Sequence, residues 1–218
     1  MDSSNSQLTS LQRKVLAALA GKPTEFFLTG GAVLAGWVLR HRHTDDLDFF
    51  TTSALAMSDV DLLIQEIAAS VGATVESTRR HPDFRRCVFR VGEESLKVDF
   101  ALDRAPQLAK KVVRDGVVTD SVEEIVANKI CALIGRSEIR DLVDLYCLDK
   151  AGYRPDDFLD SASEKDAGVT PATVAWILST FPIGGKIPGG ISESDLRAFA
   201  TAFEKRMRDR AKPGELAK

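Results

Sequence analysis

Two aspartates separated by a single residue are the strongest chemical signal in the chain. Asp46 and Asp48 lie in residues 46–51 (DLDFFT), where the apolar residues favour a β-strand. Side chains at positions i and i+2 of a strand point to the same face of a sheet, so the two carboxylates face the same way. Two divalent cations about 3.5–4 Å apart can share such carboxylates, an arrangement used for in-line phosphoryl and nucleotidyl transfer. Asp99, in a predicted strand at 95–102, would complete this metal site.

A glycine pair precedes these acids and predicts a place for phosphate. Gly30 and Gly31 follow an apolar strand at 25–29 and precede a predicted helix at 32–39. Backbone N–H groups at such a turn, beside a helix N-terminus, are free to bind phosphate oxygens. Arg42 and Thr44 flank the acids, and we expect them to contact phosphate or to orient Asp46.

A second Asp-x-Asp pair has a different context. Asp59 and Asp61 follow Ser58, a candidate helix N-cap, and acids are favourable in the first turn of a helix. We therefore interpret them as structural, in a helix that runs to about residue 71. Further strands are predicted at 73–78, 84–91 and 95–102, and residues 103–119 are predicted to be a connector.

The second half of the chain is predicted to be entirely helical. A helix begins near Ser121, Gly135 is expected to break it, and a second helix spans about 138–150. Three more helices follow, with a Gly/Pro loop at 183–190. The fold class is therefore α+β, a mixed β-sheet flanked by helices and followed by an all-helical C-terminal region. We place the boundary between residues 1–118 and 119–218.

The combined pattern resembles the nucleotidyltransferase superfamily, and more narrowly the AbiEii/AbiGii toxin family of nucleotidyltransferases. The similarity covers about residues 8–150, and one departure is Ala32, where the superfamily often has Ser or Thr. The resemblance rests on Gly30-Gly31, the run Arg42-x-Thr44-x-Asp46-Leu47-Asp48, the helix carrying Lys129, and Arg140-Asp141-x-x-Asp144-Leu145.

The resemblance implies roles for residues of the helical half. Lys129 would bind the triphosphate, and its alternative is a Lys whose stem lies along an apolar surface. Arg140 would pair either with phosphate or with Asp144 four residues later. Asp141 matches a family active-site position, so this half would contribute Lys129 and Asp141 to the nucleotide cleft.

The activity implied is an enzymatic one. A nucleotidyltransferase using Mg²⁺, or Mn²⁺ in its place, would move a nucleoside monophosphate from an NTP to an acceptor hydroxyl. The acceptor would be the end of tRNA or another RNA, or a protein. The resemblance further implies the toxin component of a bacterial type IV-like toxin–antitoxin or abortive-infection system, with a cognate antitoxin as partner.

Two alternatives compete with this reading. One is a non-catalytic nucleotidyltransferase-like protein that binds a nucleotide or a partner chain, although clustered acids without a metal repel one another. The other is a phosphatase with Asp46 as nucleophile, and it lacks the required context. Residues 41–45 are polar where an apolar strand is needed, and Phe50 stands where Thr or Val is needed.

Composition narrows the class of protein further. The chain has 218 residues, with 29 Lys and Arg against 32 Asp and Glu, so it is not a globally basic nucleic-acid coat. Its three cysteines, an odd number in apolar contexts, are expected to be reduced. We find no apolar run near the ~20 residues of a membrane span and no secretory signal, which predicts a cytoplasmic protein without a membrane partner.

Overall fold

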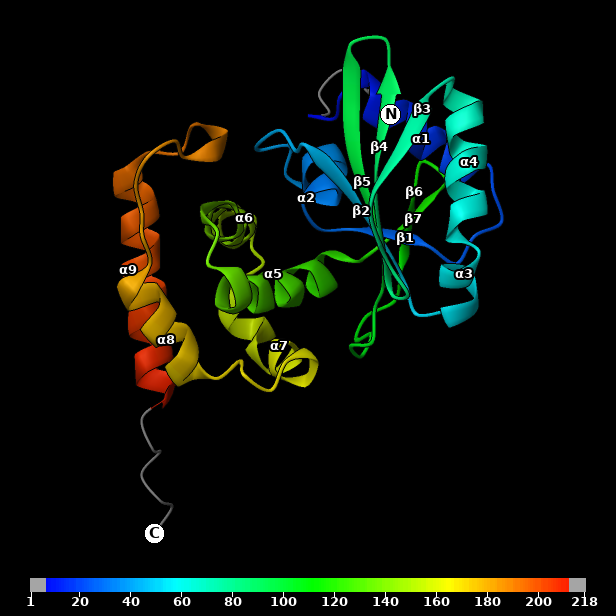
Figure 1. The fold of residues 1–218 in the computed structure, drawn as a ribbon. Helices are drawn as coiled ribbons and strands as arrows, with labels where there is room; N and C mark the ends of the chain where they lie inside the picture. Colours follow the sequence, from blue (N-terminus) through cyan, green and yellow to red (C-terminus); the bar gives the residue numbers. More distant parts are fainter. Residues whose placement is uncertain (1–6, 212–218) are drawn as a thin grey trace. The chain divides into compact units, whose positions relative to one another are not determined.

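The computed structural model describes residues 7–211, and the chain forms two compact units. The first unit comprises Met1–Arg104 and Ala109–Ser121, and the second comprises Ala105–Leu108 and Val122–Lys218. Figure 1 shows a sheet with helices in the first unit and helices alone in the second. The predicted fold class, a mixed sheet with flanking helices followed by a helical region, is confirmed.

The sheet of the first unit has seven strands in the order β3-β4-β5-β2-β1-β7-β6. β2 pairs in parallel with β5 and antiparallel with β1, while β1 pairs in parallel with β7. β2 therefore lies near the centre of a mixed sheet. The strands are β1 (Phe27–Thr29), β2 (Asp46–Thr51), β3 (Thr74–His81), β4 (Phe84–Val91), β5 (Glu94–Leu102), β6 (Val112–Arg114) and β7 (Val117–Thr119).

Strands β6 and β7 lie in the segment that the sequence analysis predicted to be a connector, and that prediction is wrong. Each strand has three residues, too few to show the alternation by which a strand is recognised. The turn between them is formed by Asp115 and Gly116, both with positive φ (49° and 82°), a conformation that favours Gly and Asp.

One face of the sheet is covered by helices α1 (Ser10–Ala20), α3 (Ala54–Ser58) and α4 (Val60–Val71) (Figure 1). The apolar side chains of this face include Phe49 and Phe100, whose rings stack with centroids 5.2 Å apart. The expected N-cap at Ser58 is wrong. Ser53 instead caps the extra helix α3, and the Ser58 hydroxyl donates back to the Leu55 carbonyl at 2.7 Å.

The predicted helix at 32–39 begins two residues earlier than expected, directly at Gly30. It consists of one α-helical turn, α2 (Gly30–Val33), followed by a π-helical turn, η2 (Leu34–Val38). Gly30 can open the helix in this way because its φ of 67° is accessible to glycine without steric cost.

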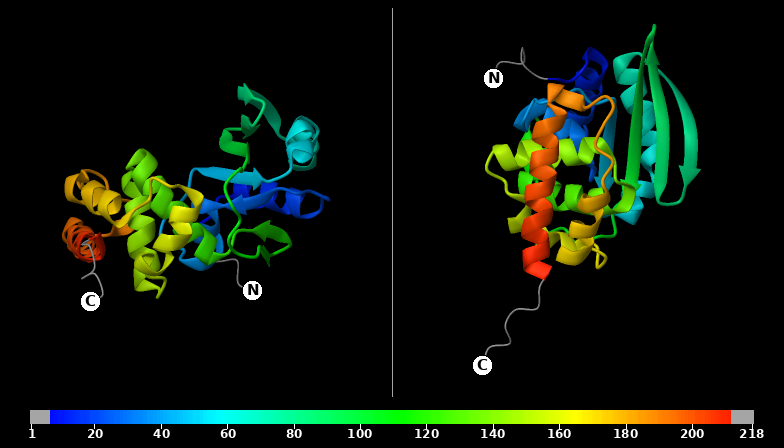
Figure 2. Two further views of the ribbon diagram at one scale, coloured as in Figure 1. Left: turned by 90° about the horizontal axis from the view of Figure 1, so that it is seen from below. Right: turned by 90° about the vertical axis from the view of Figure 1, so that its left-hand side faces the viewer.

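The second unit contains helices α5 to α9 and two short 3-10 turns. Gly135 does not break α5, which runs from Val122 to Arg136, because a helix tolerates a single glycine near its end at a cost of about 1 kcal/mol. Helices α8 and α9 lie side by side (Figure 2). The remaining elements are α6 (Ile139–Lys150), η3 (Pro155–Phe158), α7 (Leu159–Lys165), α8 (Pro171–Thr180), η4 (Pro188–Gly190) and α9 (Glu193–Ala211).

All three cysteines are free thiols, as expected. Burial, together with the nearby charges of Asp99 and Asp61, raises the pKa of the Cys87 thiol to about 12. Burial likewise raises the pKa of Cys131 to about 11. Both side chains therefore remain protonated and act as small apolar groups. Separately, none of the helices in the described part of the chain is long and apolar enough to span a bilayer.

Candidate functional site

The predicted acids gather on the sheet face opposite α1 and α4. In the register of the sheet, Asp48 of β2 lies directly beside Asp99 of β5 on one side and beside Thr29 of β1 on the other. Paired residues on neighbouring strands point to the same face, about 4.8 Å apart. Asp46, two residues before Asp48, shares this face. The structure therefore brings together the three carboxylates that the sequence analysis selected.

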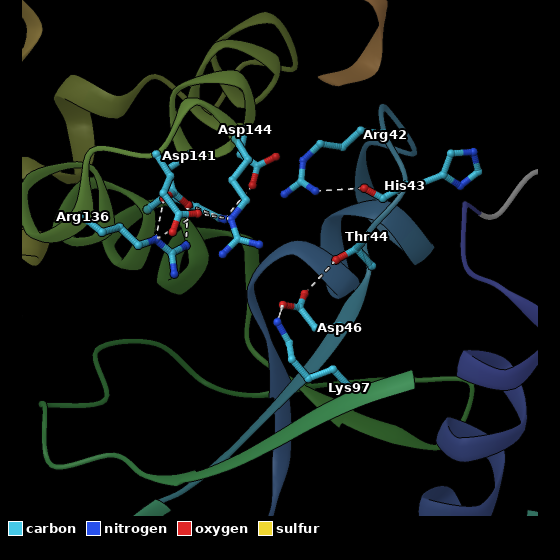
Figure 3. Close-up of polar contacts among 11 residues, drawn as sticks. Arg42, His43, Thr44, Asp46, Lys97, Arg136, Asp141 and Asp144 are labelled. Atoms are coloured by element: carbon cyan, nitrogen blue, oxygen red, sulfur yellow. Dashed lines mark hydrogen bonds and ion pairs between the residues drawn. The ribbon is translucent and has the colours of Figure 1, made fainter. Parts of the chain in front are cut away.

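Asp46 is buried and lies between a hydroxyl and an ammonium group. Its Oδ1 accepts a hydrogen bond from the Thr44 hydroxyl at 3.3 Å, and its Oδ2 lies 2.8 Å from Nζ of Lys97 (Figure 3). Gln12 of α1 fixes the backbone just before β2, because its buried side-chain amide donates a hydrogen bond to the Thr44 carbonyl at 2.8 Å. Gln12 also forms the capping box of α1 with Thr9. The N-terminus of α1 is therefore hydrogen-bonded to the segment that carries Thr44.

Asp99 is held by an arginine that the sequence analysis did not select. Both of its oxygens accept hydrogen bonds from Arg86 of β4, at 2.8 and 2.5 Å. This hydrogen-bonded pairing raises the pKa of Arg86 against the opposing effect of burial, and the charges of Asp99, Asp48 and Asp46 add to the rise.

The glycine pair lies against this cluster for a steric reason. A Cβ added to Gly31 would lie 3.0 Å from Nη2 of Arg42 and 3.3 Å from the Thr44 hydroxyl oxygen, closer than nearly all real Cβ contacts. A Cβ on Gly30 would lie 3.7 Å from Oδ2 of Asp48. Arg42 is itself buried and donates to the His43 carbonyl at 3.0 Å (Figure 3). At Gly31 a side chain would therefore crowd Arg42 and Thr44, whereas at Gly30 the positive φ of 67° is what favours glycine.

The donor chemistry of this cluster fits a hard divalent cation, although the carboxylates are not gathered into a ready-made cage. Within residues 7–211, no three His, Cys, Asp or Glu side chains are placed together as a metal site. The physical reason is pairing, since Lys97 and Arg86 draw the Asp46 and Asp99 carboxylates toward themselves. Carboxylate oxygens on one strand face are nevertheless the donors that Mg²⁺ prefers.

A fourth carboxylate, which the sequence did not indicate, lies next to the row formed by Thr29, Asp48 and Asp99 on neighbouring strands. Asp120 follows β7, is almost fully buried, and accepts a hydrogen bond from the Thr29 hydroxyl at 2.5 Å. Its other oxygen lies 2.6 Å from Nζ of Lys111, which also lies 3.6 Å from the centre of the Phe27 ring. Thr29 thus links the row to a buried ion pair. The sequence carried no signal for this, because β7 was not predicted.

A hollow of about 440 Å³ opens beside the Asp46 end of the row. Its lining includes Thr44, Lys97 and Arg90, together with Gln12 of α1. Asp45 also lines the hollow, so it is bordered by side chains of both charges.

The second unit carries its own buried cluster of predicted residues. Nζ of Lys129 on α5 lies 2.9 Å from Asp141 and 2.6 Å from Asp144, both on α6. Arg136 donates two further hydrogen bonds to Asp141, each at 2.8 Å (Figure 3). Lys129 is 5% exposed and both aspartates are fully buried, so this lysine does not lie along the surface. Asp144 and Arg136 are members of the cluster that the sequence analysis did not select as site residues.

Two cations and two carboxylates form this cluster, and Glu138 lies 3.9 Å from Nε of Arg136. Burial alone would raise the pKa of Asp141, but the hydrogen bonds and charges of Arg136 and Lys129 outweigh it and lower the pKa below its usual value. Arg140 lies next to the cluster in sequence, and its Nε is 2.5 Å from Glu138.

Comparison with known proteins gives one family and two informative structures. A family model described as "Nucleotidyl transferase AbiEii toxin, Type IV TA system" matches residues 14–216. A search of curated proteins finds no match.

The solved structures resemble the chain in fold. JHP933 from Helicobacter pylori superposes with a TM-score of 0.60 and 22% identity, covering 92% of each chain. MenT4, a nucleotidyltransferase toxin from Mycobacterium tuberculosis, superposes with a TM-score of 0.57 and 19% identity, covering 90% of this chain and 85% of MenT4. At these identities the likeness establishes the fold.

Proposed function

The chain belongs to the AbiEii nucleotidyl transferase toxin family, and from this membership we propose that it is an active, metal-dependent nucleotidyltransferase. It would transfer a nucleoside monophosphate from an NTP to an acceptor hydroxyl in the cytoplasm, as the toxin of a pair with a cognate antitoxin. The observation that carries the proposal is the placement of Asp46, Asp48 and Asp99 on one face, beside a glycine turn that suits phosphate.

The proposed reaction is an in-line displacement at the α-phosphorus of the NTP. The acceptor oxygen forms a bond to this phosphorus, the bond to the bridging oxygen breaks, and pyrophosphate leaves. The proton of the acceptor hydroxyl passes to a nearby base. A bound Mg²⁺ would neutralise phosphate charge as a Lewis acid.

The residues of the first unit divide this work. Asp46 and Asp48 would hold the cation, while Thr44 orients Asp46 through its hydrogen bond. Asp99 would bind a second ion or accept the proton through the lone pairs that its two hydrogen bonds from Arg86 leave available. Gly30 and Gly31 would admit phosphate oxygens to their backbone N–H groups, with Arg42 close by.

In the second unit, triphosphate binding by Lys129, phosphate binding by Arg140 and the active-site position of Asp141 remain predictions. Lys129 is already engaged by two carboxylates, so its positive charge is compensated in this arrangement. A direct contact with a triphosphate would require it to exchange one of these partners.

The test is a transfer assay with matched variants. Purified protein is incubated with Mg²⁺, each α-³²P-labelled NTP and total bacterial RNA. Label on RNA or on protein that disappears in Asp46→Ala/Asp48→Ala supports the proposal. Asp59→Ala/Asp61→Ala is the matched control, since that pair starts α4 on the other face of the sheet, and it should retain transfer. No label on RNA or protein, together with no binding of any NTP, would favour a non-catalytic protein that binds a partner chain.

A further inference from the structure

A row of arginines leads across the sheet to the candidate carboxylates. Arg79 of β3 pairs in register with Arg86 of β4, and Arg86 pairs with Asp99 of β5. The three side chains therefore share the sheet face of Asp48. At about 4.8 Å per strand, Arg79 lies about 10 Å from Asp99, on the edge strand of the sheet.

An aromatic ring lies within this row. The Arg79 guanidinium is 5.7 Å from the centre of the Phe84 ring, and that of Arg86 is 5.5 Å away. Arg79 is exposed, and within residues 7–211 it forms no ion pair with a carboxylate. Two flat guanidinium groups against a half-exposed ring give this face both positive charge and surfaces on which a base can stack.

The neighbouring arginines of the same hairpin have a different environment. Arg80 and Arg85 point to the opposite face, and both pair with Asp61 of α4. They therefore contribute to packing of α4 on the sheet and supply an internal control. Figure 2 shows the β3–β4 hairpin with α4 beside it.

The hairpin is basic in an otherwise acidic chain. Residues 74–91 contain five arginines and two acidic residues, whereas the whole chain has a net charge of −3. On the face of Asp99, the exposed Arg79 and the half-exposed Phe84 ring suit a polyanion that carries bases, and a protein hydroxyl would not require them.

We propose that Arg79, Phe84 and Arg86 form the acceptor subsite and bind the single-stranded end of an RNA. Phosphates of the strand contact the arginines, and a base stacks on the Phe84–guanidinium surface. The strand then runs along the row toward Asp99 and Asp48. This inference rests on the proposed function, because it names the acceptor of that reaction.

The direct test is equilibrium binding of a fluorescein-labelled single-stranded RNA oligonucleotide to the full chain, without NTP, over a range of salt concentrations. A plot of the logarithm of the RNA association constant against the logarithm of the salt concentration should be less steep for Arg79→Ala than for the wild type. The slope should differ by about 0.7, the value for one lost phosphate contact on a single strand. Phe84→Leu should weaken binding about five-fold or more, since base–aromatic stacking is worth about 1–3 kcal/mol. Arg80→Ala should bind RNA as the wild type does.

A second measurement separates failure of this inference from failure of the proposed function. Arg79→Ala should lose transfer to RNA while keeping Mg²⁺–NTP binding, and Asp46→Ala/Asp48→Ala should keep RNA binding while losing transfer. Selective loss of RNA binding in Arg79→Ala supports the subsite even if the wild type transfers nothing. Equal RNA binding by wild type, Arg79→Ala and Phe84→Leu, or transfer to protein without RNA binding, overturns it.

Discussion

Replacement of Lys129 by methionine should strongly destabilise the second unit. Lys129→Met keeps much of the length of the side chain but removes the positive charge that lies 2.9 Å from Asp141 and 2.6 Å from Asp144. Asp141 keeps Arg136, whereas Asp144 loses a close cation in a fully buried position. Removing one partner of a buried ion pair typically costs about 3–5 kcal/mol, a large part of the roughly 5–15 kcal/mol that stabilises a domain.

The measurement is urea unfolding followed by circular dichroism at pH 7. Lys150→Met is the matched control, because Lys150 is exposed at the end of α6, the helix that carries Asp141 and Asp144, and its Nζ lies 5.6 Å from the centre of the Tyr146 ring. It should change the free energy of unfolding by less than about 0.5 kcal/mol.

A double variant sharpens the test. Lys129→Met/Asp144→Asn should be more stable than Lys129→Met alone by about 1 kcal/mol or more, because a neutral amide replaces a buried carboxylate that has lost its lysine partner. A loss below about 1 kcal/mol in Lys129→Met, or no recovery in the double variant, would refute the idea that this lysine holds the cluster together.

Three further outcomes are expected. Gly31→Ala should lower the transfer rate about ten-fold, because the added Cβ would press on Arg42 and Thr44. Gly135→Ala is the control. It should keep the rate and raise the melting temperature, since no atom lies within 4 Å of the added Cβ. The lowered pKa of Asp141 contributes stability that is complete above the unfolded pKa near 4 and is lost as pH falls through the lower folded value. Below about pH 4, the melting temperature of Asp141→Asn should therefore depend less steeply on pH than that of the wild type. An equal slope in the two proteins would contradict this. EDTA should abolish transfer and excess Mg²⁺ restore it, which a label-transfer assay checks directly.

The fold was predictable where one strong local signal was present. The predicted strand at 84–91, with its alternating pattern, coincides with β4 (Phe84–Val91). The predictions of the helix cap and of the connector were wrong, because the local sequence there is compatible with more than one structure. Ser53 and Ser58 are both acceptable caps, and the choice depends on how α3 packs on the sheet. β6 and β7 exist because β7 adds to β1, a long-range pairing invisible in three residues.

The sequence was sufficient to select the acidic residues of the candidate site, but not the residues that pair with them. Asp46 and Asp48 are recognisable because a strand places i and i+2 on one face, and Asp99 because its strand has a similar pattern. Arg86, Lys97 and Asp120 reach the acids only through the register of β4, β5 and β7, which the sequence did not reveal. In the helical unit, Asp144 follows Asp141 by three residues, a spacing that places both on one helix face.

The most direct test of nucleotidyl transfer is the fate of the two ends of the triphosphate. Wild-type protein is incubated with Mg²⁺, RNA and the same NTP labelled with ³²P either at the α- or at the γ-phosphate. For nucleotidyl transfer, the α-label becomes attached to the acceptor, the γ-label is released as pyrophosphate, and both events cease in Asp46→Ala/Asp48→Ala. Attachment of γ-label to the acceptor, or release of pyrophosphate at an equal rate by the double variant, would contradict it.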